Sequence, residues 1–94
     1  MINADQMKYF IEIVEQGSLN KAAQHLFISQ PALTKQLGIL EKSMKCKLLI
    51  RTPNGVKLTA SGRYFYERSK TITSMINETI TKIEGFNNGN IIRV

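Results

Sequence analysis

Hydrophobic positions in the first half of the chain recur at three- and four-residue intervals, the spacing that places side chains on one face of an α-helix. In residues 3–16 this pattern predicts a first helix, with Asn3 or Asp5 as its N-cap and Gly17 as the left-handed residue that ends it. Its predicted buried face consists of Met7, Phe10, Ile11 and Val14.

Two further helices are predicted after Gly17. Ser18 offers an N-cap for a short helix over residues 19–26, and Ser29 offers one for a third helix with Pro31 in its first turn. A proline is tolerated there because the first N–H groups of a helix have no partner within it. The buried faces of these helices are predicted to be Leu19, Ala22, Ala23 and Leu26, then Leu33, Leu37 and Leu40.

Residues 47–58 lack this helical spacing. Two short β-type runs, residues 47–52 and 56–58, flank the turn sequence Pro53-Asn54-Gly55. A proline followed by Asn-Gly between apolar runs is a strong signal for a tight turn. The sequence therefore predicts a small antiparallel hairpin behind the third helix.

The helical spacing returns after the hairpin and continues to residue 86. Thr59 or Ser61 can cap this last helix, which would be about 40 Å long at 1.5 Å per residue. So small a domain cannot cover a helix of that length, so we expect Tyr64 and Phe65 to pack on the domain and the later apolar residues to meet a partner. The apolar face comprises Phe65, Ile72, Ile76, Ile80, Ile83 and Phe86, with Thr71, Thr73, Ser74, Asn77 and Thr81 on the other faces.

Residues 87–90, Asn-Asn-Gly-Asn, break the helix, and residues 91–94 have the pattern of a strand that is just beginning. We therefore predict three parts: a compact domain over residues 1–58, a linker and dimerisation helix over residues 59–86, and a hinge with the start of a truncated domain over residues 87–94.

Charge narrows the class of partner. The 94 residues carry a formal net charge of +6. Residues 29–57 contain six basic residues and one acidic residue, Glu41, a net charge of +5. This concentration of positive charge favours a polyanion such as nucleic acid, although charge alone also fits an acidic membrane surface.

The chemistry-bearing residues are few. One cysteine, Cys46, and one histidine, His25, exclude an internal disulfide and a multi-cysteine zinc site. No nucleophile–base pair or phosphate-binding glycine loop can be assembled, so we expect no enzyme and no metal or other cofactor in this segment. Because a single cysteine favours a reducing compartment and no apolar run approaches the roughly 20 residues of a membrane span, we expect a cytoplasmic protein and no membrane partner.

The order of elements is that of a winged helix-turn-helix. A short helix, a tight turn and a third helix form the helix-turn-helix, and the hairpin behind them forms the wing. In this motif the N-terminal end of the second of these two helices enters the major groove of DNA. The fold class is therefore predicted as mostly α: three helices and a two-stranded wing, followed by a long linker helix.

Residues 29–34, Ser-Gln-Pro-Ala-Leu-Thr, give a more specific indication, since a general helix-turn-helix does not require Gln-Pro at this point. With Gly17-Ser18-Leu19 before it and Leu58-Thr59 after it, this motif resembles the N-terminal signature of LysR-type transcriptional regulators. The resemblance covers nearly the whole chain. It implies that residues 1–58 form a DNA-binding domain and that residues 59–86 form a linker helix that pairs two protomers. It also implies that residues 87–94 are the hinge and the start of a truncated downstream domain that senses a small effector.

The resemblance also implies roles for individual residues. We expect a homodimer bound to operator double-stranded DNA, with a tetramer of the full-length protein as the alternative. By position, it implies base reading by Gln30, Pro31, Ala32, Thr34 and Lys35, wing contacts by Arg51, Asn54, Gly55 and Lys57, and phosphate contacts by Ser18 and Lys21. Dimerisation is expected through Ile72, Ile76, Ile80, Ile83 and Phe86.

The sequence departs from the family pattern behind the third helix. Lys45-Cys46 stands where relatives usually have Gly-Val, so either the turn differs or Lys45 adopts the left-handed conformation. Leu49 and Ile50 stand where an aromatic and an acidic residue are commoner. An exposed Ile50 would leave an apolar spot beside the wing, available for a contact with another chain.

Structural alternatives apply to several of these residues. Gln30 to Lys35 could be an ordinary solvated helix face, and Arg51 and Lys57 solvated wing charges. Ser18 is first of all a helix cap. We expect His25 to have no functional role and Cys46 to be a partly buried structural residue. For the whole chain, a winged-helix module that binds an acidic protein is the competing hypothesis.

Overall fold

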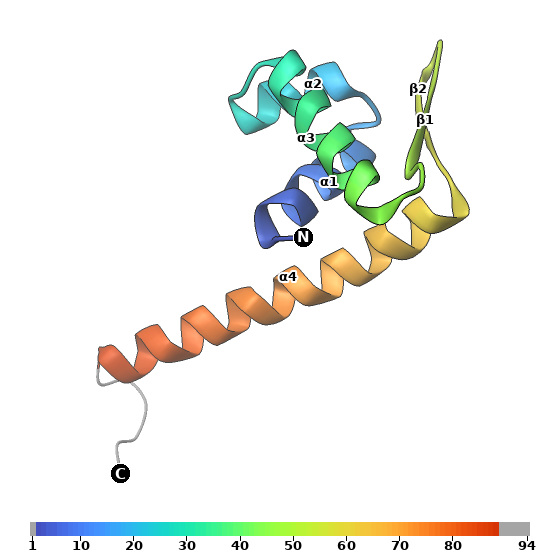
Figure 1. Cartoon of the computed structure of the whole chain (residues 1–94). Helices are drawn as coiled ribbons and strands as arrows, with labels where there is room; N and C mark the ends of the chain where they lie inside the picture. Colours follow the sequence, from blue (N-terminus) through green and yellow to red (C-terminus); the bar gives the residue numbers. More distant parts are fainter. Residues whose placement is uncertain (1, 89–94) are drawn as a thin grey trace.

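The computed structural model describes residues 2–88, and the predicted strand at residues 91–94 lies outside them. Three helices come first, then a two-stranded hairpin and one long helix (Figure 1). This is the predicted mostly α architecture. The elements are α1 (Ala4–Gln16), α2 (Leu19–Leu26), α3 (Gln30–Met44), β1 (Leu49–Thr52), β2 (Gly55–Leu58) and α4 (Ala60–Asn87).

Side chains cap the helices much as the sequence predicts. Asn3, rather than Asp5, begins α1 in a capping box with Gln6, which satisfies two backbone N–H groups at once. Ser18 and Ser29 cap α2 and α3. Thr59, rather than Ser61, caps α4. These caps fix where the turns of the helix-turn-helix lie.

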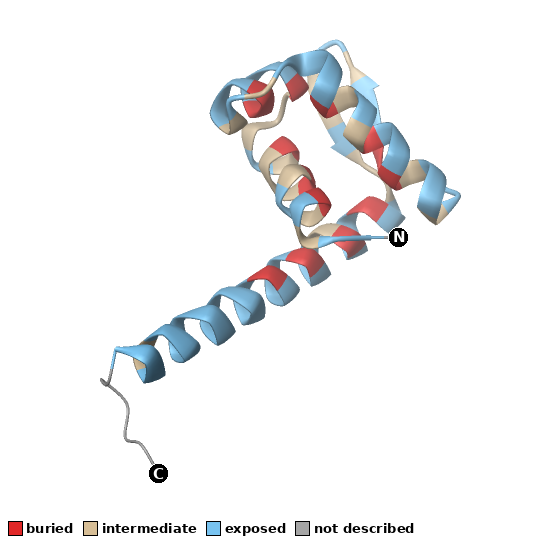
Figure 2. Ribbon diagram, turned by 60° about the vertical axis from the view of Figure 1, so that its left-hand side comes forward, coloured by how far each residue is buried: buried red, intermediate tan, exposed pale blue. Residues whose placement is uncertain are grey.

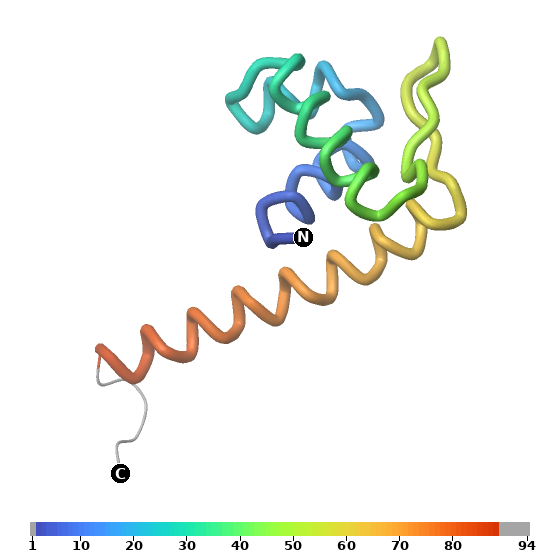
Figure 3. The backbone as a smooth tube through the Cα atoms, in the orientation of Figure 1, coloured from blue at the N-terminus to red at the C-terminus, as the bar shows by residue number. Residues whose placement is uncertain are grey.

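Two turns contain left-handed residues other than glycine. Gly17 ends α1 with φ +73°, as expected, but Phe27 ends α2 and Lys45 ends α3 with φ +59° each. The backbone passes from α1 to α2 and from α2 to α3 through short turns (Figure 3). The amide of Lys45 donates to the carbonyls of the last turn of α3. Lys45 therefore keeps the turn that glycine would make more easily.

The hydrophobic core lies between α1, α2, α3 and the start of α4. Phe10 of α1 packs edge-on against Phe65 of α4, with ring centroids 5.1 Å apart. The predicted face of α1 is partly wrong, because Ile13 is fully buried whereas Ile11 is only half-buried. The other core residues are Leu19, Ala22, Ala23, Leu33, Leu37, Leu40, Leu48 and Leu49.

The wing is a tighter hairpin than the sequence indicates. β1 and β2 pair antiparallel with Thr52 opposite Gly55, so only Pro53 and Asn54 form the loop. Gly55 has φ +133°, and a Cβ atom there would overlap the carbonyl oxygen of Gly17. The next residue, Val56, donates its amide to that same oxygen at 3.3 Å. The wing is thus held against the turn between α1 and α2.

Helix α4 is buried only along its first half (Figure 2). Its buried positions, Gly62, Phe65, Ser69 and Thr73, recur at three and four residues. Two expectations are corrected here: Tyr64 is 67% exposed, and Thr73 is buried with its hydroxyl donating to the carbonyl of Ser69 at 2.9 Å. The molecule measures 56 × 26 × 20 Å because the second half of α4 extends beyond the domain (Figure 1).

None of the helices within residues 2–88 is both long and apolar enough to cross a membrane.

Candidate nucleic-acid interface

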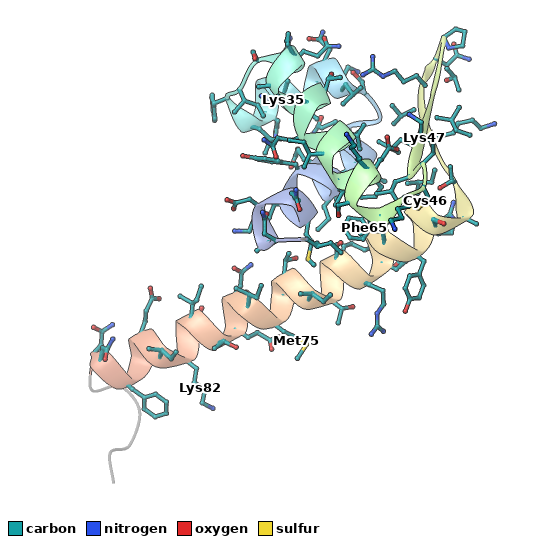
Figure 4. The ribbon with its side chains drawn as sticks, viewed as in Figure 1. Lys35, Cys46, Lys47, Phe65, Met75 and Lys82 are labelled. Atoms are coloured by element: carbon teal, nitrogen blue, oxygen red, sulfur yellow. The ribbon has the colours of Figure 1, made fainter. Side chains whose placement is uncertain are left out.

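The first turns of α3 are uncovered. Gln30, Pro31, Ala32 and Lys35 are all exposed, and Lys35 projects from the part of the domain farthest from α4 (Figure 4). Thr34 lies one turn on from Gln30 and is half-buried. The structure therefore presents together, on one helix end, the five residues that the sequence proposes as base readers, while Leu33 and Leu37 hold the opposite face of α3 in the core.

The start of α2 contributes a second group. The Ser18 hydroxyl accepts a hydrogen bond from the Lys21 amide at 3.1 Å, which is the capping role expected first for this serine. Its own hydrogen can still be donated, and the Lys21 side chain is exposed. A helix N-terminus with an exposed lysine favours the binding of a phosphate group.

The wing contributes the third group. Arg51, Asn54 and Lys57 are exposed. The guanidinium Nη2 of Arg51 donates a hydrogen bond to the hydroxyl of Thr34 on α3 at 3.2 Å. One predicted wing residue and one predicted base reader are therefore in direct contact.

A hollow of about 390 Å³ lies between α3 and the wing. The start of α2, α3 and both strands of the wing contribute residues to its lining. Leu37, Leu49 and Val56 form part of its apolar lining, and Thr34 and Arg51 also line it. Gly55 is held against Gly17 beside it, which gives this glycine a structural role that the sequence did not reveal. A DNA contact by Gly55 remains a prediction.

Glu41, the one acidic residue of the basic segment, is turned inward. Its carboxylate accepts hydrogen bonds from the amides of Leu48 and Leu49 at 2.7 and 3.1 Å, and Lys47 Nζ lies 3.6 Å away. The acid thus joins the end of α3 to the start of β1. Among the described residues its ion-pair partner is Lys47, whereas Lys35, Arg51 and Lys57 are exposed to solvent and form no ion pair with it.

A separate apolar surface runs along α4 from Ile72 to Phe86. Its members are at least a third exposed; they are the predicted dimerisation residues Ile72, Ile76, Ile80, Ile83 and Phe86, joined by Met75, which the prediction missed. Met75 projects from α4 on the side away from α1 to α3 (Figure 4). It lies three residues after Ile72, a spacing that could have revealed it. We call these six residues the α4 apolar stripe.

His25 and Cys46 lie apart from these surfaces. His25 Nδ1 is 2.9 Å from Glu12 Oε2, a contact that links α2 to α1. Cys46 is exposed, so the expectation of a partly buried cysteine is wrong. The reason is its place in the turn after Lys45, outside both α3 and the wing. Across residues 2–88, no three His, Cys, Asp or Glu side chains are grouped so that they could hold a metal ion.

Solved structures of known proteins share this arrangement. The structure of a BenM DBD in complex with catB site 1 DNA superposes with a TM-score of 0.92 at 29% identity, covering 99% of this chain and 100% of that one. A CbnR DBD–DNA complex gives a TM-score of 0.85 at 32% identity, covering 92% of this chain and 99% of that one.

Curated relatives match over the same region. The nitrogen assimilation regulatory protein nac of Klebsiella aerogenes is 46% identical over 71 residues, which are 76% of this chain and 23% of that protein. The HTH-type transcriptional regulator TfdT of Cupriavidus pinatubonensis is 39% identical over 74 residues, 79% of this chain and 32% of that protein. The chain thus spans about a quarter to a third of the length of these relatives.

Residues 4–63 match the model of the family described as "Bacterial regulatory helix-turn-helix protein, lysR family". The matched segment begins with α1, contains α2, α3 and the wing, and ends in the first turn of α4. It therefore includes every residue that the structure places around the hollow. The chain belongs to the lysR family of bacterial regulatory helix-turn-helix proteins.

Proposed function

We propose that this chain binds double-stranded operator DNA in a sequence-specific manner, as the DNA-reading part of a transcriptional regulator. The observation that carries the proposal is the uncovered first turns of α3, flanked by the basic wing and the start of α2. The crystal structures of DNA complexes among its structural neighbours support it. Catalysis forms no part of the proposed role, and the relatives are transcriptional regulators.

In this proposal, base reading belongs to α3. Its N-terminal end enters the major groove, where Gln30 can form two hydrogen bonds with adenine and Ala32 can contact a thymine methyl group. Lys35 reaches guanine or a phosphate, and Thr34 and Pro31 complete the reading surface. A good bidentate pair contributes roughly 1–3 kcal/mol of discrimination between bases.

Backbone contacts belong to the flanking elements. Ser18 and Lys21 bind a phosphate at the start of α2, and Arg51, Asn54, Gly55 and Lys57 place the wing on the neighbouring backbone or minor groove. Such contacts set the position of the protein on the duplex without reading its sequence.

The second half of α4 supplies the dimer contact in the proposed assembly. Two protomers would place their α3 helices in successive major grooves about 34–36 Å apart, or at a multiple of that distance. We further propose that the full-length protein acts in the cytoplasm on the nucleoid and that a separate domain binds a small effector. The proposed division of the chain remains a DNA-binding domain over residues 1–58, a linker helix over residues 59–86 and a hinge with the start of the next domain over residues 87–94.

Two substitutions distinguish base reading from backbone contact. Gln30→Ala should relax base preference at one position in each half-site, because it removes a side chain that can pair with adenine. Lys57→Ala should weaken binding to all sequences alike and reduce the dependence of log affinity on log salt by about one phosphate contact. The measurement is selection from a random duplex pool, followed by salt titrations on the selected sequence.

The wild-type chain is the reference for both variants. If neither substitution changes binding to the selected duplex, the assignment of readers is wrong. If the wild-type chain shows no salt-sensitive retention on duplex DNA at physiological ionic strength, DNA binding itself is wrong, and the alternative of a module for an acidic protein partner gains support.

A further inference from the structure

The hydrogen bond between Arg51 and Thr34 joins the wing to α3, and only one of the two side chains can be its donor. A guanidinium group carries only hydrogen-bond donors. The Thr34 hydroxyl oxygen must therefore accept from Arg51 Nη2 at 3.2 Å, which leaves the hydroxyl hydrogen for another partner.

Other helical threonines in this chain use that hydrogen differently. Thr71, Thr73 and Thr79 each donate it to the backbone carbonyl four residues earlier, at 3.4, 2.9 and 2.8 Å. Across residues 2–88, the hydrogen bond found at the Thr34 side chain is the one it accepts from Arg51. The hydroxyl hydrogen of Thr34 is therefore available to a partner outside the chain, on the surface that faces DNA in the proposed function.

Arg51 is well placed to maintain this hydrogen bond. Arg51 pairs in the hairpin with Val56, and the Val56 amide donates to the Gly17 carbonyl, so the hairpin is anchored beside Arg51, near its loop end. Glu41 also lines the hollow, but its carboxylate is already engaged by the amides of Leu48 and Leu49. Among the described residues, Arg51 forms no ion pair that would compete with Thr34.

Resting on the proposed function, we propose that Arg51 is a positioning residue for base reading, acting through Thr34. A hydrogen bond from a cation polarises the hydroxyl and makes it a better donor. The nearby positive charge also favours base atoms that accept hydrogen bonds over amino groups that donate them. Thr34 therefore selects the acceptors guanine O6 or N7 or thymine O4 over the amino group of cytosine, and also over adenine, whose N7 acceptor stands beside an amino group.

This role differs from a simple phosphate contact. A phosphate contact by Arg51 alone predicts weaker binding to every sequence when the side chain is removed. A positioning role predicts, in addition, a change of base preference at the position that Thr34 reads. Arg51 retains four other N–H donors, so both contacts are compatible with one side chain.

The test is selection from a random duplex pool with the wild-type chain and the variants Thr34→Val, Thr34→Ser, Arg51→Ala and the double variant Thr34→Val/Arg51→Ala. Thr34→Val, which keeps the shape but removes the hydroxyl, identifies the base position that Thr34 reads. We expect guanine or thymine to be preferred there by the wild type. The preference should fall by about 2- to 13-fold in Thr34→Val, as for the loss of one hydrogen bond of about 0.5–1.5 kcal/mol.

Arg51→Ala should lose the same preference at the same position, and the double variant should lose no more of it than either single variant. Thr34→Ser, which keeps the hydroxyl, should retain it. Lys57→Ala is the matched control, because it removes another exposed basic side chain from the wing without touching Thr34. It should lower affinity and leave the preference intact. Thermal unfolding of each variant confirms that it is folded.

Three results would overturn the inference while leaving DNA binding in place. Arg51→Ala could behave like Lys57→Ala, with its base preference unchanged. The losses in the two single variants could add in the double variant, or the position could favour cytosine in the wild type. Selection of no duplex sequence by the wild type would instead overturn the proposed function, and the inference with it.

Discussion

Gly62→Ala should destabilise the fold by about 3 kcal/mol, the upper end of the usual cost of overpacking a filled site. Gly62 is buried in the first turn of α4, and a Cβ atom there would overlap the carbonyl oxygen of Leu48 and lie 2.9 Å from its carbonyl carbon. The glycine is required for the close approach of α4 to the segment between α3 and β1, not for its backbone angles. The measurement is urea unfolding followed by circular dichroism at one fixed protein concentration, since a dimer contributes to apparent stability.

The Leu48 carbonyl cannot easily move away from an added methyl group. It accepts hydrogen bonds from the amide and the hydroxyl of Thr59 at 3.1 and 3.3 Å, and the Leu48 side chain is fully buried. Moving this carbonyl would break the cap that begins α4 or open the core. We therefore expect the cost to appear as lost stability and not as a small local shift.

Gly38→Ala is the matched control, because it is the same substitution in another helix. A Cβ atom at Gly38 meets nothing within 4 Å, and the residue lies in the interior of α3. Alanine there should stabilise the fold by about 0.5–1 kcal/mol through better helix propensity. If the two variants had the same stability, the close approach of α4 to Leu48 would be wrong.

The helices and the wing could be predicted from the sequence because helix caps and turns are specified by residues close together in the chain. Ser18, Ser29 and Gly17 act on residues within one turn of themselves, so their roles are visible without a fold. The wing was also predictable, although its loop proved to be two residues and not three, because pairing of Thr52 with Gly55 depends on the hairpin as a whole.

What the sequence could not predict depends on contacts between distant segments. Ile13 and Thr73 are buried because α1 and the first half of α4 pack together, and one helix's periodicity does not show how wide the covered face is. The hydrogen bonds that the Glu41 carboxylate accepts from the amides of Leu48 and Leu49, and the bond from Arg51 to Thr34, arise only when the wing folds back beside α3. The roles of the individual DNA-contact residues remain predictions for the experiments above.

The double substitution Ile76→Glu/Ile83→Glu should have the largest effect on function, because it should separate the two protomers that bind the two half-sites of an operator. Both side chains belong to the α4 apolar stripe and are 36% and 52% exposed, so no part of the described domain covers them fully. Burial of a hydrophobic side chain contributes about 1.5–3 kcal/mol, whereas an unpaired carboxylate in the same place opposes association. Sedimentation should therefore show monomers.

Loss of the dimer should reduce affinity for a two-half-site operator by about 10²- to 10⁴-fold, because binding of the second half-site is no longer intramolecular. Affinity for a single half-site should change much less, since α3 and the wing are untouched.

Ser74→Glu/Thr81→Glu is the matched control: it adds the same charges at the same spacing of seven residues on exposed positions outside the stripe. Dimers that persist in Ile76→Glu/Ile83→Glu would place the contact elsewhere, with the exposed Ile50 beside the wing as the next position to test. Monomers in both double variants would mean that negative charge on α4, and not the apolar stripe, controls assembly.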